Sequence, residues 1–172
     1  LYKQKFDKTV MDCLNLNGGK KHSQIDYLKK AIDTYKDPKH VVTIAMCGKY
    51  NSLHDAYKSI LEAFIHSGID NDAKVNVKWI DTEKLEKDKN YINEFKNVDG
   101  ILIPGGFGDR GIEGKIMSAQ YARENNIPFL GICLGMQCAV IEFARNMCGF
   151  KNANSTEFNN KTSYPVIDLM PS

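Results

Sequence analysis

Residues 128–135 read Pro-Phe-Leu-Gly-Ile-Cys-Leu-Gly, and the fold can be inferred outward from this stretch. The apolar run from Pro128 to Ile132 predicts a buried strand, and the residues from Gly135 to about Met147 predict a helix. A strand that passes into a helix through so short a turn is the basic unit of a parallel α/β sheet.

The same alternation extends back along the chain. It predicts strands at residues 41–46, 75–79 and 100–103, and helices at residues 55–68 and 112–125. The unbroken apolar run at 41–46 indicates a strand buried on both faces. Asp55 is expected to cap the first helix, and Gly68 to end it. We therefore predict an α/β fold, an open and mostly parallel sheet with helices on both faces, whose ligand crevice lies beyond the carboxyl ends of the strands.

Residues 1–40 differ from this pattern, because they are rich in lysine and only weakly periodic. Ile25, Leu28, Ala31 and Ile32 recur at helical spacing and predict one short helix. We therefore expect residues 1–40 to be a linker or docking arm, and residues 41–172 to form the domain.

The composition excludes several classes of protein. The formal net charge of the 172 residues is only +2 and no basic stripe is present, so a nucleic-acid partner has no electrostatic support. No apolar run reaches the ~20 residues that span a bilayer. The five cysteines are odd in number and form no Cys-x-x-Cys pair, which argues against a metal site or a disulfide framework and favours a cytoplasmic location.

Two glycine-rich turns stand at the expected crevice. The first, at residues 106–111, matches Gly-x-Gly-x-x-Gly, a pattern that dinucleotide-binding proteins share. Such a site also needs an acidic residue at the end of the next strand, about 20 residues on, and residues 130–133 contain none. A structural tight turn is therefore favoured over a cofactor site, and we expect no cofactor in this domain.

The second turn, Gly131–Gly135, has the form of a nucleophile elbow with a thiol. Cys133 would project at a helix N-terminus, where the helix dipole favours thiolate over thiol. The amide of Leu134 can face a developing oxyanion, and the Gly105–Gly106 turn can supply a second amide. The alternative is that Cys133 is a small buried hydrophobe. Cys13, Cys47, Cys138 and Cys148 lack this setting and are interpreted as packing or surface residues.

Five segments resemble class I glutamine amidotransferases and, within them, CTP synthases. These segments are residues 48–50, 104–111, 131–137, 139–146 and 153–158, and the resemblance covers roughly residues 38–171. It implies the layered, flavodoxin-like fold of that class and a cysteinyl thioester formed from glutamine at Cys133.

The resemblance also implies roles for individual residues. Gly106 and Leu134 would supply the oxyanion amides, and the glutamine pocket would be lined by Gly106, Leu134, Gly135, Met136 and Gln137, with Glu157 receiving the α-ammonium group. The loop with Phe107, Arg110 and Gly111 would bind an activating GTP. No residue is assigned to a metal.

For the whole enzyme, the resemblance implies the amination of UTP to CTP with ammonia from glutamine. An N-terminal synthetase domain of the same polypeptide would bind ATP and Mg²⁺ and hold a homo-oligomer together. The base of the class comes from a His-Pro-Glu motif, and none of His22, His40, His54 and His66 is followed by Pro-Glu. We therefore expect the amidotransferase fold to lack its C-terminal part here, and the 172-residue chain alone to be poorly active.

Two alternatives stay open at this point. One is the glutaminase of another class I amidotransferase, such as those of GMP or anthranilate synthesis. The other is a non-catalytic module of the same fold that serves regulation or assembly. The Glu-Phe-Ala-Arg-Asn run at 142–146 and the Ala-Asn-Ser-Thr-Glu-Phe run at 153–158 favour CTP synthase over the first alternative. The intact elbow at Gly131–Gly135 argues against the second.

Overall fold

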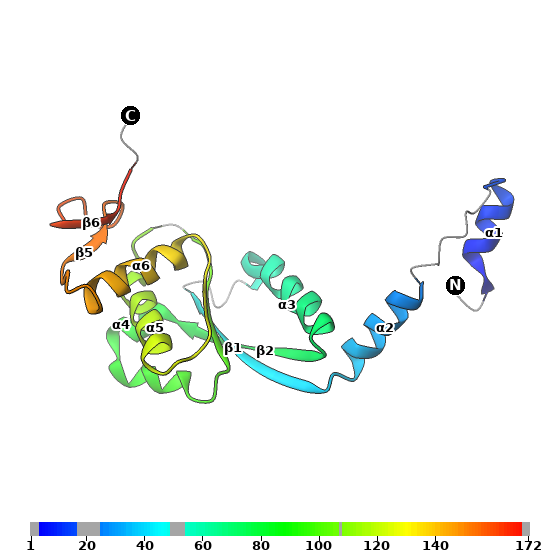
Figure 1. Cartoon of the computed structure of the whole chain (residues 1–172), viewed down its shortest axis with the longest axis horizontal. Helices are drawn as coiled ribbons and strands as arrows, with labels where there is room; N and C mark the ends of the chain where they lie inside the picture. Colours follow the sequence, from blue (N-terminus) through cyan, green and yellow to red (C-terminus); the bar gives the residue numbers. More distant parts are fainter. Residues whose placement is uncertain (1–3, 17–24, 49–53, 107, 170–172) are drawn as a thin grey trace.

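The structure is a computed structural model that describes residues 4–16, 25–48, 54–106 and 108–169. Its main sheet has four strands in the order β2-β1-β3-β4, and every neighbouring pair is parallel (Figure 1). The strands are β1 (His40–Gly48), β2 (Ala73–Asp81), β3 (Gly100–Ile103) and β4 (Phe129–Gly131). The predicted α/β fold with a parallel sheet is confirmed.

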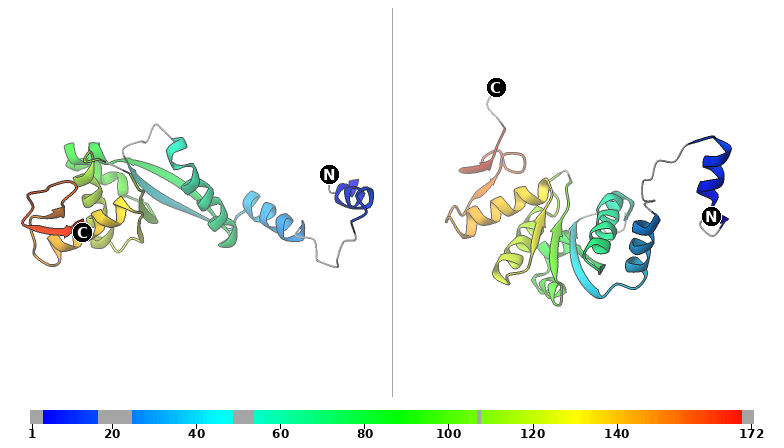
Figure 2. Two further views of the ribbon diagram at one scale, coloured as in Figure 1. Left: turned by 90° about the horizontal axis from the view of Figure 1, so that it is seen from above. Right: turned by 45° about the vertical axis from the view of Figure 1, so that its right-hand side comes forward.

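Helices cover both faces of the sheet, as predicted. Figure 2 shows α2 (Ile25–Lys36) and α3 (Lys58–Asp70) on one side, and α4 (Thr82–Lys87), α5 (Ile112–Glu124) and α6 (Leu134–Asn146) on the other. The second face buries the main core, in which Leu85, Phe95 and Ala119 pack against Cys47 and Ile103 of the strands. Phe95 ends a 3-10 segment, η3 (Lys89–Phe95), that leads into β3.

The strand order changes direction at β1. From β1 the chain passes through α3 to β2 on one side, and then crosses over to β3 on the other side. In open α/β sheets a ligand crevice forms at such a reversal, beyond the carboxyl ends of the strands. The ends of β1 and β3 therefore mark where a site belongs.

The prediction for the first helix was wrong at both ends. A 3-10 turn, η2 (His54–Tyr57), precedes α3, and the N-cap is Tyr57 instead of Asp55. Gly68 lies inside the helix, which continues to Asp70. A Cβ at Gly68 would come within 2.4 Å of the Ala73 carbonyl oxygen, so this glycine serves the close approach of β2 and does not end the helix.

The burial expected for residues 41–46 is only half correct. Ala45, Met46 and Cys47 are fully buried, whereas Val41 is 60% exposed. The reason is that β3 pairs with β1 only from Ile44 onward, so the first part of β1 has β2 as its only neighbour in the described sheet.

The described residues of the first 40 form two helices where one was predicted. The expected helix is α2, which contacts α3 and β2. The additional helix, α1 (Phe6–Cys13), lies away from the sheet (Figure 1). The division of the chain at residue 40 stays a prediction.

A second, two-stranded sheet follows α6 and was not predicted. It pairs β5 (Ala153–Ser155) with β6 (Tyr164–Ile167). Arg145 of α6 ties it to the domain, because its Nε donates to the Ala153 carbonyl at 2.8 Å and its Nη1 lies 2.7 Å from Glu113 of α5. Arg123 and the buried Glu142 form a second link between α5 and α6, at 2.8 Å.

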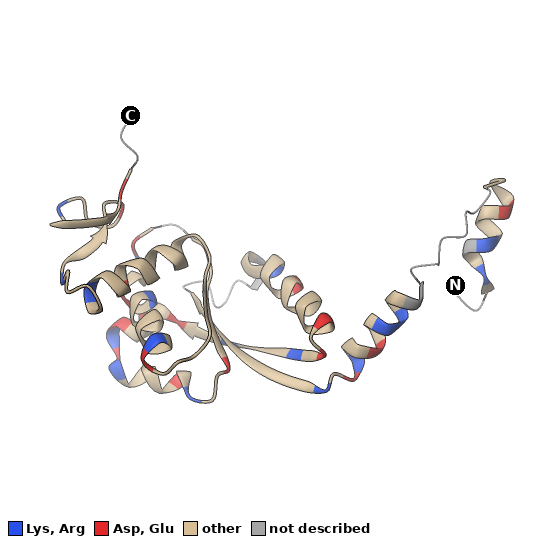
Figure 3. Ribbon diagram, viewed as in Figure 1, with Lys and Arg blue, Asp and Glu red and all other residues tan. Residues whose placement is uncertain are grey.

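Charged side chains of both signs are interspersed over the helices (Figure 3). Within the described ranges, no helix has the length and apolar character needed to cross a membrane. Helix α6 and its C-cap Met147 expose an apolar stripe, formed by Met136, Val140, Phe143 and Met147, each between 39% and 55% exposed.

Candidate active site

The two glycine-rich turns lie side by side at the carboxyl edge of the sheet. The amide of Ile132 donates to the Ile103 carbonyl at 2.9 Å, which holds the end of β4 against the end of β3. A Cβ at Gly105 would lie 3.5 Å from the Cβ of Cys133. The turn after β3 therefore runs directly beside the thiol that follows β4, next to the reversal of strand order.

Cys133 has an unusual backbone conformation. Its φ is +51° and its ψ is −105°, and it forms the N-cap of α6. The other non-glycine residues with positive φ in the described chain are one lysine and four Asn or Asp residues, and Asn and Asp adopt positive φ more often than other non-glycine types. Such a conformation costs about 1–3 kcal/mol and is kept only where the surroundings enforce it.

The two glycines of the elbow enforce this geometry through main-chain contacts. A Cβ at Gly135 would lie 2.2 Å from the Ile103 carbonyl oxygen, and one at Gly131 would lie 2.5 Å from the carbonyl carbon of Gly135. No side chain fits at either position. The start of α6 thus packs against β3 and β4 backbone to backbone, and Cys133 is left exposed above them.

The two residues whose amides the resemblance assigns to an oxyanion lie close together. Leu134 is the first residue of α6, where an amide has no acceptor within the helix. Its side chain is buried, and one of its methyl carbons would lie 3.8 Å from a Cβ at Gly106. The main chain of Gly106 therefore rests on Leu134, beside Cys133.

The residues assigned to glutamine surround the same turn. Gly135 is buried and Met136 is 54% exposed. The amide of Gln137 donates to the Cys133 carbonyl at 3.1 Å, and its side-chain oxygen Oε1 is buried without a hydrogen-bond partner among the described residues.

Glu157 lies in the turn after β5. It is exposed, and its backbone amide donates a hydrogen bond to the hydroxyl of Ser155 at 3.2 Å. The next residue, Phe158, packs on the apolar cluster that contains Leu134 and Cys138. This contact brings the Glu157 segment to the same cluster as the first turns of α6.

The loop assigned to GTP is only partly described, since Phe107 lies outside the described residues. Arg110 is exposed and has its Nη1 3.8 Å from a carboxylate oxygen of Glu83. Gly111 has a φ of +71°, and a Cβ there would lie 2.5 Å from the hydroxyl of the buried Thr82. Packing against α4 thus accounts for this glycine of the Gly-x-Gly-x-x-Gly match without a cofactor.

The remaining cysteines have different surroundings. Burial raises the pKa of Cys47 to about 12 and that of Cys138 to about 11, so both stay thiols near neutral pH. Cys13 and Cys148 are exposed, at the end of α1 and just after α6. No group of three His, Cys, Asp or Glu side chains in the described ranges could hold a metal ion.

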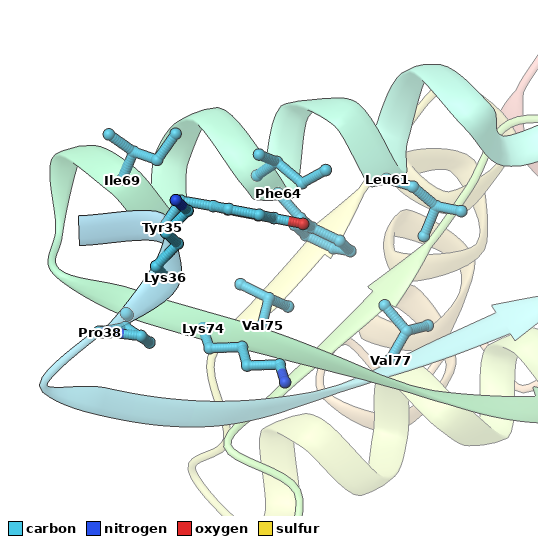
Figure 4. A pocket seen from close by; sticks show the side chains of 11 residues that line it. Tyr35, Lys36, Pro38, Leu61, Phe64, Ile69, Lys74, Val75 and Val77 are labelled. Carbon is cyan, nitrogen blue, oxygen red and sulfur yellow. The ribbon is translucent and has the colours of Figure 1, made fainter. Parts of the chain in front are cut away.

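A larger hollow lies elsewhere among the described residues. It has a volume of about 550 Å³ and lies where α2 meets α3 and β2 (Figure 4). Leu61, Phe64 and Ile69 of α3 form one wall, and Val75 and Val77 of β2 form another. This lining holds no thiol or carboxylate, so the hollow lacks the groups that amide hydrolysis needs.

Comparison with known proteins identifies the family. The profile described as "Glutamine amidotransferase class-I" matches residues 52–168, more than half of the chain. The chain belongs to the class I glutamine amidotransferases. Within its sequence the family match includes both glycine-rich turns and Glu157.

The chain is similar to curated CTP synthases. The chain is 54% identical over 171 residues to the CTP synthase of Caldanaerobacter subterraneus, and 53% identical over 176 residues to that of Methanocaldococcus jannaschii. Each alignment covers 99% of this chain but only 31% or 32% of the relative, so the chain spans about a third of their length.

A solved structure agrees with this assignment. The glutaminase domain of Trypanosoma brucei CTP synthase, with bound acivicin, has a TM-score of 0.70 and 44% sequence identity. The match covers 75% of this chain and 50% of the trypanosomal one. The chain is thus homologous to the glutaminase domain of CTP synthases.

Proposed function

We propose that this chain hydrolyses glutamine through a thioester formed at Cys133. The observation that carries the proposal is the backbone of Cys133, held at a φ of +51° in an exposed turn between a strand and a helix. Conformations of this kind cluster at active sites, where a reacting atom must be presented in one fixed orientation.

The reaction follows from the groups around the sulfur. The thiolate of Cys133 adds to the carboxamide carbon of glutamine, and the amide oxygen takes up the negative charge. The amides of Leu134 and Gly106 are proposed to donate hydrogen bonds to that oxygen. Breaking of the C–N bond, with proton transfer to the nitrogen, releases ammonia and leaves a glutamyl thioester, which water converts to glutamate.

Glutamine itself is proposed to bind over the first turn of α6. Leu134, Gly135, Met136 and Gln137 line the pocket, and Glu157 receives the α-ammonium group. Two observations support this placement: Met136 is exposed beside Cys133, and Phe158 packs on the same cluster as Leu134.

Turnover also needs a base, for thioester formation and for hydrolysis. The resemblance assigns that base to a His-Pro-Glu motif, which does not occur among the 172 residues. We therefore propose that the 172-residue chain alone turns glutamine over slowly. A glutaminase assay in which this chain matches an intact CTP synthase would contradict that proposal.

For the whole protein, we propose CTP synthesis. Ammonia would aminate UTP in a synthetase domain that uses ATP and Mg²⁺ and joins the subunits of a homo-oligomer. GTP would activate glutamine hydrolysis at the loop of Phe107, Arg110 and Gly111. The support is the 54% identity to a CTP synthase across 99% of this chain. A cytoplasmic location agrees with five free cysteines, since free thiols persist in reducing compartments.

A labelling experiment tests the nucleophile. The protein is treated with a chloroketone analogue of glutamine, and peptide mapping then finds the modified cysteine. We expect modification of Cys133, with Cys13 and Cys148 as internal controls because they are equally free and exposed. Equal labelling of the three thiols, or no protection of Cys133 by free glutamine, would contradict the proposal.

A second assay tests the whole-protein activity. The protein expressed from its complete reading frame is supplied with glutamine, ATP and Mg²⁺, and with UTP, xanthosine monophosphate or chorismate. Amination of UTP supports CTP synthesis, whereas amination of either other acceptor supports another class I amidotransferase. A folded protein in which Cys133 is not labelled and no aminated product forms would favour a module that serves regulation or assembly.

A further inference from the structure

Lys115 has a position that glutamine hydrolysis, as proposed above, does not explain. It is the only buried lysine among the side chains that the structure describes, with 4% exposed. Lysine is rarely buried to this extent, because removing an ammonium group from water is costly. The burial of Lys115 is not evident from the sequence, because Lys115 lies between Gly114 and Ile116 in a helix, as a surface lysine could.

The side chain of Lys115 reaches the turn beside the nucleophile. Lys115 lies in the first turn of α5, and its Nζ is 3.5 Å from the Arg110 carbonyl oxygen. Together with Gly105, Gly106 and Leu134 it lines a cavity of about 10 Å³, roughly the space of one water molecule. The lysine therefore lies behind the two residues whose amides are proposed to bind the oxyanion.

The electrostatics of two buried thiols place the charge in the same region. Burial raises the pKa of both Cys47 and Cys138, and the positive charge of Lys115 opposes both increases. Cys47 lies at the end of β1 and Cys138 in the second turn of α6, so the ammonium group acts between these elements. The other charges that act on Cys138 are Glu113 and Arg145, which are paired with each other at 2.7 Å.

We propose that Lys115 is a positioning residue for the oxyanion site. Its side chain supports Gly105, Gly106 and the Arg110 carbonyl from the interior of the protein. Its charge stabilises the negative oxygen that forms at the amides of Gly106 and Leu134. Charges interact more strongly in a site that excludes water than in solution, and a fixed charge needs no reorganisation when the oxyanion appears. This inference rests on the proposed glutamine hydrolysis at Cys133.

The test removes the charge while keeping the shape. Lys115→Met has a similar length without the ammonium group, and Lys115→Gln keeps a donor for the Arg110 carbonyl. Lys84→Met, on the exposed surface of α4, makes the same change of charge as a control. Each variant of the protein expressed from its complete reading frame reacts with two reagents, and modification of Cys133 is followed by peptide mapping.

The two reagents separate the oxyanion from the thiol. The chloroketone analogue of glutamine forms an oxyanion when Cys133 adds to its carbonyl, whereas iodoacetamide is attacked at carbon by direct displacement. We expect both Lys115 variants to react about tenfold more slowly with the chloroketone, against ~10²–10³ for loss of a direct oxyanion donor. Their iodoacetamide rates and melting temperatures should match those of the unsubstituted protein and of Lys84→Met.

Three outcomes would overturn the inference. An unchanged chloroketone rate in either Lys115 variant shows that the charge is not needed. An equal decrease with both reagents, or a decrease only in a variant with a lowered melting temperature, shows a structural role alone. If the unsubstituted protein itself fails to react with the chloroketone at Cys133, the proposed function fails, and the two failures are thus distinguishable.

Discussion

The two glycine-rich turns differ in how much their sequence patterns reveal. The turn at residues 106–111 matches a long and well-known pattern, yet the contact of Gly111 with Thr82 explains its glycine by packing. The turn at residues 131–135 matches a shorter pattern, and there both glycines touch main chain and the residue between them is strained. A sequence motif indicates function when its residues are needed for a geometry that packing alone does not explain.

The largest expected effect separates the nucleophile from a neighbouring thiol. Cys133→Ser should lower glutamine hydrolysis by the whole enzyme at least ~10³-fold, because loss of a nucleophile leaves only the contribution of binding and oxyanion stabilisation. Cys138 is buried in the second turn of α6. The Cys138→Ser variant should retain activity within about tenfold. Ammonia-dependent amination is the control, since it bypasses the glutaminase. Equal losses in both variants would remove the distinction between the two thiols.

The next effect contrasts one glycine of each turn. Gly135→Ala places a Cβ 2.2 Å from a carbonyl oxygen and should destabilise the protein by about 3 kcal/mol, at the upper end of overpacking. Gly106→Ala meets nothing closer than 3.8 Å and should change stability by less than ~1 kcal/mol. Urea unfolding of the two variants measures both. Similar losses would show that the elbow is not packed more tightly than the neighbouring turn.

A smaller effect tests why Gly111 is a glycine. Gly111→Ala should cost about 1–2 kcal/mol, because its φ is +71° and the new methyl group meets the Thr82 hydroxyl. Thr82→Ala removes that hydroxyl, so the double variant should lose at least ~0.5 kcal/mol less than the sum of the single variants. Additive losses would remove the packing explanation and reopen a ligand at this loop.

The smallest effect concerns pH. Burial raises the pKa of Cys138 from 9.0 to about 11, so the folded protein keeps a proton that the unfolded chain loses. This difference in proton binding should leave stability unaffected well below pH 9 and lower it as the pH rises toward 11, by up to about 1.4 kcal/mol per pH unit for each such thiol. Cys138→Ala should make this fall shallower than it is in the unsubstituted protein. Unfolding measured between pH 8 and pH 11 gives the slopes; equal slopes in the two proteins would contradict the expectation.

Sequence patterns predicted most of this fold because each element obeys a local rule. The helices that begin at Ile112 and near Gly135, and the strands at 75–79 and 100–103, have clear periodicity, and they lie within one or two residues of the expected bounds. The prediction that Gly68 ends a helix was wrong, because a glycine that ends a helix and a glycine that allows a strand to approach look identical in sequence. The pair β5 and β6 was missed because its three- and four-residue strands are too short to show a period.

Some residues of the candidate site could be predicted from the sequence and others could not. Cys133, Leu134 and the Gly105–Gly106 turn follow from the rule that strand ends meet at one edge of a parallel sheet. Burial of Lys115 could not be read from the chain, because it depends on the approach of β1, α5 and α6, which are distant in sequence. The packing of Gly111 on Thr82 depends in the same way on a helix, α4, that the pattern did not predict.

The contact between Gly135 and the Ile103 carbonyl has a consequence for how this protein can vary. The height of the sulfur above the sheet is set by main-chain atoms, which every residue at position 103 possesses. Side chains around the elbow can therefore drift during evolution, or be redesigned, without moving the reactive atom. The same contact allows no other residue at position 135, because even the Cβ of alanine, the smallest replacement, would clash with the Ile103 carbonyl oxygen. Inherited diversity should accordingly collect around the elbow and be missing from its glycines.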